Sequence, residues 1–361
     1  MKILVIQQKM IGDVLTSSVL FEVLKKEHPT SELHYLINSH TYPVVKGHPF
    51  IDDFIFFTPE IENNKLQFFN LLRRIKRENY DVVIDVYAKL SSSLITLFSC
   101  ANTRISYYKN YSSFIYNHTY KNKTLVKTTA GLAIENRLML LDPLLPIPVK
   151  NIKPKVFLTD KEKKAASEFL NKNGIDLKQP LYMISVLGSS NSKTYPFSYI
   201  AKLIDQIVSE TNAQILFNYI PKQQTDALAI YNLCTATTQK HIYFDVFGKS
   251  LRDFMSISHF CNAIIGNEGG AINMGKALGV PTFTIFSPWI KKETWSMFED
   301  GVNNISVHLK DYKPELFEHK ATKDLKPNWK TLYDSFKPEL INLSLKNFLD
   351  INLARGSQTL E

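Results

Sequence analysis

The chain has 361 residues, a formal net charge of +9 at pH 7, and 44% hydrophobic and 21% charged residues, a composition typical of a folded soluble protein. This length predicts two domains, because one hydrophobic core rarely grows beyond about 250–300 residues. The apolar runs are too short for a membrane-spanning helix, which needs about 20 residues, and the first residues lack the apolar core of a signal peptide. Three scattered cysteines without a CxxC pair favour a reducing cytoplasm and argue against a disulfide framework or a zinc site.

The first half of the chain alternates strand and helix patterns. Residues 2–6 form an apolar run typical of a buried parallel strand, and a helix is predicted from about residue 13 to 27. The further predicted strands are 33–37, 53–57, 82–85 and 104–106, and the further helices are 66–78, which is basic and amphipathic, 91–100 and 129–141. This alternation predicts a parallel sheet with helices on both faces.

A proline-rich segment, Asp142–Pro148, interrupts the alternation and marks the predicted domain boundary. We therefore expect one Rossmann-like domain over residues 1–150, a second over 151–340, and a C-terminal helix and tail over 341–361. The second half has predicted strands at 181–186, 214–217, 241–244, 263–265 and 280–286, and predicted helices at 196–210, 251–260 and 338–349, with another ending near 233.

The predicted fold class is α/β, with two parallel sheets that leave a cleft between the domains. Ligands of open α/β sheets bind beyond the carboxyl ends of the strands. Three segments follow such ends, at residues 7–13, 188–193 and 267–273.

The third of these segments is a glycine-rich turn between a strand and a helix. The first N–H groups of a helix are unpaired and lie at its positive end, so an anion can bind there. Gly269 and Gly270 would let the main chain approach a phosphate without a Cβ in the way. The turn is equally compatible with an ordinary βαβ unit that needs glycine at a tight bend.

Asp13 follows the first strand and its loop, where a carboxylate could act as a general base at the mouth of the cleft. Its alternative role is local, because aspartate is a good helix cap and is favoured in a first helical turn.

The segment Gly188–Lys193 offers the hydroxyls of Ser189 and Ser190, main-chain amides and the ammonium group of Lys193. A pyrophosphate is recognised by groups of these kinds. Any polar loop of this length contains similar residues, so the segment indicates a phosphate site only in combination with the 267–273 turn.

Several other kinds of site are not supported by the sequence. The first strand is not followed by G-x-G-x-x-G, and neither the P-loop pattern nor H-E-x-x-H nor G-x-S-x-G occurs. No Asp-x-Asp triplet is present, so a carboxylate-held metal ion on a sugar-nucleotide phosphate is not expected.

The residues between Asp85 and Glu135 include no carboxylate, and they alternate basic with aromatic side chains. Such a mixture suits nucleic acid, because bases stack on aromatic rings. It suits a membrane interface or an anionic lipid headgroup equally well, and it is also compatible with a solvated loop whose tyrosines pack on the domain beneath.

The sequence resembles the bacterial lipopolysaccharide heptosyltransferases, which form glycosyltransferase family 9. The resemblance rests on Lys2–Ile6 with Ile11–Thr16, and on Asn267–Asn273 followed by Ala277–Pro281 and Ile285–Pro288. Family members typically have N-D-S/T-G-x-x-H, then A-L-G-x-P and a G-P pair. The order of the elements, the position of the linker and the total length also fit.

The resemblance implies a GT-B fold, with two Rossmann-like domains facing across a cleft and a C-terminal helix that often returns to the first domain. It implies an inverting, metal-independent transfer of heptose, with ADP-heptose as the usual donor. By this resemblance, Asp13 falls on the carboxylate that is proposed to be the base in the family, and Lys193 falls on a lysine that contacts the donor phosphates. The other expected donor-binding residues are Gly12, Ser189, Ser190, Glu268, Gly269, Gly270, Ala271 and Asn273.

Four residues of this chain depart from the family pattern. Glu268 stands in place of Asp, Gly269 in place of Ser or Thr, and Asn273 in place of His, while Ser287 replaces the glycine before Pro288. These departures bear on the identity of the donor more than on the class of reaction.

The family's acceptor is an anionic glycolipid at the membrane, so we expect Lys121, Lys123 and Lys127 on the acceptor side. The expected partners are a nucleotide-sugar donor, this acceptor and a membrane surface contacted peripherally from the cytoplasm, and no nucleic acid. Two alternatives remain: a non-catalytic sugar-nucleotide-binding protein, and a sugar-nucleotide epimerase of the same architecture.

Overall fold

The computed structural model describes residues 1–149 and 151–353, and the chain divides into two compact units. The first unit comprises Met1–Phe157 and the second begins at Leu158. Residue 150, where the sequence placed the domain boundary, lies outside the described residues, as does the predicted tail beyond residue 353.

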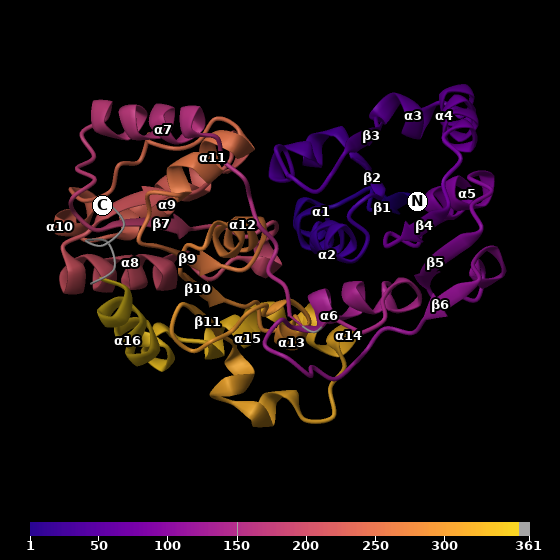
Figure 1. Ribbon diagram of the computed structural model, residues 1–361. Helices are drawn as coiled ribbons and strands as arrows, with labels where there is room; N and C mark the ends of the chain where they lie inside the picture. Colours follow the sequence, from indigo (N-terminus) through magenta and orange to yellow (C-terminus); the bar gives the residue numbers. More distant parts are fainter. Residues whose placement is uncertain (150, 354–361) are drawn as a thin grey trace. The chain divides into compact units, whose positions relative to one another are not determined.

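The first unit contains a six-stranded parallel sheet in the order β3-β2-β1-β4-β5-β6 (Figure 1). Its strands are β1 (Lys2–Ile6), β2 (Glu32–Asn38), β3 (Asp53–Phe57), β4 (Val82–Asp85), β5 (Thr103–Tyr107) and β6 (His118–Tyr120). Its helices are α1 (Ile11–Ser17), α2 (Val19–Glu27), α3 (Pro59–Asn63), α4 (Lys65–Arg77), α5 (Leu90–Phe98) and α6 (Leu132–Met139). The predicted parallel α/β unit is confirmed, and β6 is a strand that the sequence analysis did not predict.

The helix predicted over residues 13–27 is two helices in the structure, because the chain breaks at Ser18. The N–H of Ser18 donates to the carbonyl of Leu15 at 3.2 Å, and its hydroxyl donates to the same carbonyl at 2.8 Å. Serine and threonine hydroxyls compete in this way with the regular helical bonds. The break ends α1 one turn after Asp13.

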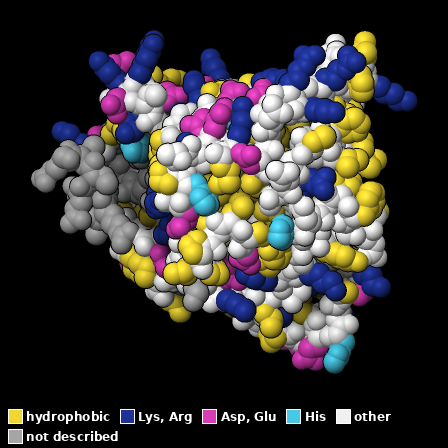
Figure 2. Space-filling view, turned by 45° about the vertical axis from the view of Figure 1, so that its right-hand side comes forward, with side chains coloured by type: hydrophobic (Ala, Val, Ile, Leu, Met, Phe, Trp, Pro, Cys, Tyr) yellow, Lys and Arg dark blue, Asp and Glu magenta, His cyan; other side chains and the backbone are white. Residues whose placement is uncertain are grey.

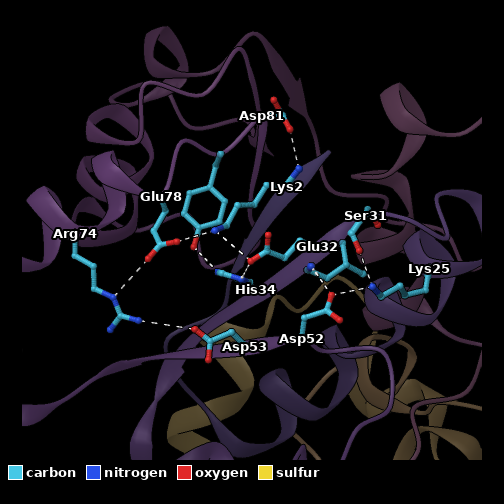
Figure 3. Close-up of polar contacts among 12 residues, drawn as sticks. Lys2, Lys25, Ser31, Glu32, His34, Asp52, Asp53, Arg74, Glu78 and Asp81 are labelled. Carbon is cyan, nitrogen blue, oxygen red and sulfur yellow. Dashed lines mark hydrogen bonds and ion pairs between the residues drawn. The ribbon is translucent and has the colours of Figure 1, made fainter.

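The amino ends of the strands in the first unit are joined by an ionic network (Figure 3). Lys2 Nζ lies 2.7 Å from Glu78 Oε2 and 3.2 Å from Glu32 Oε1, and its backbone N–H donates to Asp81 at 2.7 Å. The buried ring of His34 contacts Tyr80 and Glu32, each at 2.7 Å. These charges hold the register of β1, β2 and β4 at the edge opposite to the one that carries Asp13.

The second unit contains a five-stranded parallel sheet in the order β11-β10-β9-β7-β8 (Figure 1). Its strands are β7 (Leu181–Ser185), β8 (Gln214–Phe217), β9 (Ala263–Asn267), β10 (Thr282–Ile285) and β11 (Asn304–Val307). Its helices are α7 (Asp160–Lys172), α8 (Phe197–Thr211), α9 (Gln224–Leu233), α10 (Ala236–Gln239), α11 (Leu251–Ser258), α12 (Gly270–Leu278), α13 (Lys292–Trp295), α14 (Thr322–Leu325), α15 (Trp329–Ser335) and α16 (Asn342–Leu353).

The strand predicted at 241–244 is wrong. Ile242 makes one isolated parallel bridge with Ile215, and the chain then turns, with the N–H of Val246 donating to the carbonyl of Tyr243 at 3.1 Å. The apolar run is short, and α10 ends directly before it, so the segment passes the edge of β8 without extending the sheet.

The C-terminal helix α16 packs into the core of the second unit. Leu345, Phe348 and Leu349 of α16 are fully buried in the core of the second unit. The rings of Phe348 and Phe283 lie 5.6 Å apart, so the apolar stripe of α16 is used within this unit, beside the sheet.

An ion pair joins the first helix of the second unit to α11. Arg252 donates from Nε to Glu162 Oε1 at 2.8 Å and from Nη2 to Oε2 at 2.5 Å. The Arg252 guanidinium lowers the pKa of Glu162 from its ordinary value of 4.5 to about 2. Glu162 also accepts from the backbone N–H of Thr159 at 2.8 Å in a capping box at the start of α7.

We expect Glu162→Gln to lower the free energy of unfolding at pH 7 by about 1 kcal/mol or less, since the pair is partly screened by solvent. Glutamine keeps the capping contact and removes only the charge. Because the folded-state pKa is depressed, the stabilisation is present above pH 4.5 and disappears as the pH falls towards 2. Urea unfolding followed by tryptophan fluorescence measures it, because Trp289, Trp295 and Trp329 all belong to the second unit.

The matched control is Glu168→Gln on the same helix, where the carboxylate lies 4.0 Å from Lys164 in an exposed pair. It should leave the unfolding free energy unchanged. A deficit of Glu162→Gln that was as large at pH 2 as at pH 7 would show that the ion pair is not its cause.

Candidate active site

Asp13 lies at the carboxyl edge of the sheet in the first unit, as the third residue of α1. Its Oδ1 accepts a hydrogen bond from Arg137 Nη2 at 2.7 Å, and about a quarter of its side chain is exposed. Met10 is the residue before α1, and no side chain caps the helix. Asp13 is therefore not the N-cap residue, but it does lie in the first turn of α1, where a carboxylate is favoured. Its carboxylate is held by Arg137.

Arg137 is buried on α6, and each of its three guanidinium nitrogens donates a hydrogen bond. Nε donates to Ser17 at 2.8 Å and Nη1 to the carbonyl of Ala133 at 2.7 Å. The third contact fixes one oxygen of Asp13, while Oδ2 has no hydrogen-bond partner among residues 1–149 and 151–353. One oxygen is thus positioned and the other remains available for a proton.

The sequence analysis did not single out Arg137, although its position carried a signal. It lies in the apolar stretch Leu132–Met139, and a buried arginine requires a charged or polar partner. The sequence could have indicated that such a partner exists, but not that the partner is Asp13, 124 residues away.

The lysines expected on the acceptor side lie in the segment between β6 and α6, and α6 holds this segment in place. The backbone N–H of Lys123 donates to Asn136 at 2.7 Å, and that of Lys127 to Glu135 at 2.9 Å. Lys121 and Lys127 are exposed, and Lys121 Nζ lies 5.6 Å from the ring centroid of Tyr108. The helix that orients Asp13 therefore also anchors the lysine segment.

In the second unit, Asn267 joins the two segments expected to bind the donor. It ends β9 and is fully buried. Its Nδ2 donates to the carbonyls of Ser185 and Val186, each at 2.9 Å, and its Oδ1 accepts from the N–H of Tyr195 at 2.7 Å. The 188–193 segment is consequently held beside the 267–273 turn.

The start of α12 is open. Gly269 precedes the helix with a φ of +153°, which L side chains rarely adopt, and a Cβ added at Gly269 or Gly270 would meet no atom within 4 Å. The first N–H groups of α12 can therefore be approached closely, as an anion site requires. Ala271 is buried behind them and Asn273 lies half-buried one turn into the helix.

Lys193 and Glu268 meet at this opening, with 3.2 Å between Nζ and Oε1. The ammonium group also lies 5.9 Å from the ring centroid of Trp289, over which Lys326 lies at 5.1 Å. Glu268 thus balances the charge of Lys193, while the neighbouring Lys326 and the start of α12 remain as further positive groups.

Ser287 and Trp289 fix the loop that carries Lys193. The hydroxyl of Ser287 donates to the carbonyl of Ser192 at 2.7 Å, and Trp289 Nε1 donates to the same carbonyl at 2.8 Å. Ser287 is the residue that replaces the family's glycine, and its hydroxyl adds a contact that glycine cannot make. Ser189 and Ser190 of this loop are exposed.

Each predicted site residue therefore lies at the carboxyl edge of its own sheet or beside it. Gly12 and Asp13 belong to the first unit, and Lys193 and Glu268 are brought together in the second. The facing of the two halves across a cleft stays a prediction. In the part of the chain that the structure describes, no three His, Cys, Asp or Glu side chains gather to hold a metal ion, and no helix is long and apolar enough to cross a membrane.

Comparisons with known proteins bear on the family and the fold of the chain. A family model described as glycosyltransferase family 9 (heptosyltransferase) matches residues 68–324, a range that includes Lys193 and Glu268 and begins after Asp13. The chain is 24% identical over 296 residues to lipopolysaccharide heptosyltransferase 1 of Campylobacter coli, covering 79% of this chain and 84% of that protein.

Two solved structures share the fold. The glycosyltransferase family 9 protein of Veillonella parvula aligns with a TM-score of 0.73 at 16% identity, over 92% of this chain and 97% of that one. The E. coli heptosyltransferase WaaC, solved with ADP, aligns with a TM-score of 0.65 at 13% identity, over 92% of this chain and 100% of that one.

We expect Ser287→Ala to loosen the 188–194 segment, because it removes one of the two donors to Ser192. A hydrogen bond of this kind contributes about 1 kcal/mol, which corresponds to roughly fivefold faster local exchange of backbone amides. Hydrogen–deuterium exchange of peptides from this segment measures the change. Ser209→Ala, which removes a hydroxyl bonded to Gln206 on the surface of α8, is the control; equal exchange in both variants would contradict a positioning role for Ser287.

Proposed function

Because this chain belongs to glycosyltransferase family 9, the heptosyltransferases, we propose that it moves a heptose from ADP-heptose to a sugar hydroxyl of the lipopolysaccharide core, with inversion and without a metal ion. The chain is a glycosyltransferase with two parallel α/β domains of the GT-B type. The proposal of a nucleotide-diphosphate donor rests on one observation, the open start of α12 with Lys193 beside it, because backbone N–H groups and an ammonium group suit a diphosphate. The structure of E. coli WaaC, which was solved with ADP, supports ADP as the nucleotide part of the donor.

The proposed donor site holds the diphosphate at the N–H groups that follow Gly269. A helix start stabilises an anion by about 0.3–1 kcal/mol, and by up to about 2 kcal/mol when partly buried. That is less than a leaving diphosphate requires, so Lys193 must supply part of the stabilisation. Glu268 Oε1 lies 3.2 Å from the ammonium group of Lys193 and holds it at the opening, so an incoming phosphate would compete with Glu268 for this group.

The proposed base is Asp13. The acceptor hydroxyl attacks the anomeric carbon, its proton passes to Oδ2 of Asp13, and the bond from the anomeric carbon to the diphosphate oxygen breaks. Arg137 holds Oδ1 and so orients the carboxylate through the step. A single displacement with one base inverts the anomeric centre and needs no covalent intermediate.

The acceptor in this proposal is an anionic glycolipid, with Lys121, Lys123 and Lys127 on its side. Support comes from their segment, which is basic, largely exposed and tied to α6, the helix that orients Asp13. Binding of an anionic acceptor there would bring its hydroxyl towards the base within one unit of the protein.

We expect Asp13→Asn to lower kcat by about 10²–10⁴-fold, the usual contribution of a general base, and to leave the KM for ADP-heptose nearly unchanged. Steady-state transfer to a lipopolysaccharide inner-core acceptor measures both constants. Asp53→Asn, at the opposite edge of the same sheet, is the control and should behave as wild type. A folded Asp13→Asn enzyme with near-normal turnover would remove Asp13 from the mechanism.

We expect turnover to persist in excess chelator, because Lys193 and the start of α12 would take the place of a metal ion. Under the same conditions Lys193→Ala should weaken ADP binding about tenfold in titration calorimetry, as expected for the loss of a charge-assisted contact. Lys202→Ala, which removes an exposed lysine of α8, serves as the control. Complete loss of activity in chelator, restored by Mg²⁺, would refute the metal-independent mechanism.

A further inference from the structure

The outer faces of α4 and α5 expose large apolar side chains. These helices pack on the sheet of the first unit through Leu71, Leu72, Ile75 and Ile95, which are buried. Their opposite faces carry Leu66, Phe69, Leu90, Leu97 and Phe98, of which Leu66 and Leu90 are 65% and 68% exposed. The 3-10 helix η2 (Ser113–Ile115), which contacts α5, adds Phe114 at 80% exposure.

The same region is positively charged. Residues 65–134 contain only three carboxylates. Glu78 pairs with Lys2 at 2.7 Å, Asp81 accepts from the N–H of Lys2 at 2.7 Å, and Asp85 is fully buried and accepts from Tyr116 at 2.6 Å. Glu78 also lies 4.0 Å from Arg74 of α4, and Asp53 lies 3.8 Å from the same arginine, so the cations beside the apolar residues are Arg73, Lys76 and Arg77.

The cations of α4 form a hollow beside the apolar residues. Arg73, Lys76 and Arg77 line it together with Asn79, and it is a shallow depression of about 580 Å³ that is largely open to solvent. The guanidinium of Arg73 lies 4.8 Å from the ring centroid of Phe69, so the basic and apolar groups are direct neighbours. Figure 2 shows one face of the molecule, on which hydrophobic side chains lie among lysine and arginine, with acidic side chains between them.

We propose that this surface, the outer faces of α4, α5 and η2, docks on an anionic lipid bilayer. Leu66, Phe69, Leu97 and Phe98 would enter the interfacial layer, as the apolar side of a membrane-surface helix does. Arg73, Lys76 and Arg77 would lie at the level of the lipid phosphates, where each basic residue strengthens binding to anionic lipid. A folded protein partner is less well matched, because unpaired cations beside bulky exposed apolar side chains suit a fluid anionic layer.

The inference rests on the proposed function in one respect: docking would bring the enzyme to the surface where a glycolipid acceptor resides. A hydrogen bond of 2.8 Å from Ser91 on α5 to Gln8 connects the docking helices to the loop before Asp13. The docking surface and the candidate base are therefore parts of the same unit.

Flotation with vesicles tests the inference, using phosphatidylethanolamine with phosphatidylglycerol, and neutral phosphatidylcholine for comparison. Wild-type protein should bind the anionic vesicles and should be released by high salt. The charge variant Arg73→Gln, Lys76→Gln, Arg77→Gln and the apolar variant Leu66→Gln, Phe69→Gln, Leu97→Gln should each bind about tenfold more weakly or worse. The control variant Lys161→Gln, Lys164→Gln, Lys172→Gln removes the same charge from α7 and should bind as wild type.

The assay contains neither donor nor acceptor, so its result is separate from that of the transfer assay. Asp13→Asn should bind the vesicles as wild type does, even though its turnover falls. The inference is overturned if wild type does not bind anionic vesicles, or if the α7 control loses as much binding as the charge variant. It is also overturned if wild type is a dimer that the apolar variant converts to a monomer, because the surface would then join two copies of the chain.

Discussion

The buried side-chain amide of Asn267 is the contact on which the candidate donor site depends. It bonds to the end of β7 and to the N–H of Tyr195, and so holds two loops from different parts of the sequence in one place. A buried amide that lost one of these partners would leave a polar group unsatisfied, at a cost of about 1–3 kcal/mol. Ser287 and Trp289 both donate to the carbonyl of Ser192 in the loop that Asn267 anchors, so the position of Lys193 depends on this junction.

The first unit uses a buried arginine in an analogous way. Arg137 donates hydrogen bonds to Ser17 and to the carbonyl of Ala133, and a third hydrogen bond orients Asp13. The same helix ties down the segment of Lys123 and Lys127 through Asn136 and Glu135. In both units, therefore, a buried polar side chain away from the opening positions the groups that are proposed to meet substrate.

The sequence was sufficient for the alternation of strands and helices, because buried parallel strands and amphipathic helices have different periods. It failed where neighbouring structure decides the outcome. The apolar run at 241–244 had strand composition but lies where only one bridge to Ile215 forms, and the break at Ser18 depends on a hydroxyl bonding back to Leu15. The place of α16 depends on which core its apolar stripe joins, which no local pattern specifies.

For the site, the sequence indicated the residues and their kinds of chemistry, but not the contacts that position them. Asp13 and the glycine turn could be found because they follow buried strands. The pairing of Lys193 with Glu268, and the bond from Ser287 to Ser192, join residues more than 70 positions apart and become visible only in three dimensions. They also give two departures from the family pattern, Glu268 and Ser287, a physical role.

The central claim is that a nucleoside diphosphate binds at the start of α12 beside Lys193. Hydrogen–deuterium exchange with and without ADP tests it most directly, because the proposed ligands include backbone N–H groups. ADP should slow exchange in the 267–273 turn and in the 188–193 segment. Unchanged exchange in both segments at saturating ADP, with protection elsewhere in the chain, would contradict the account.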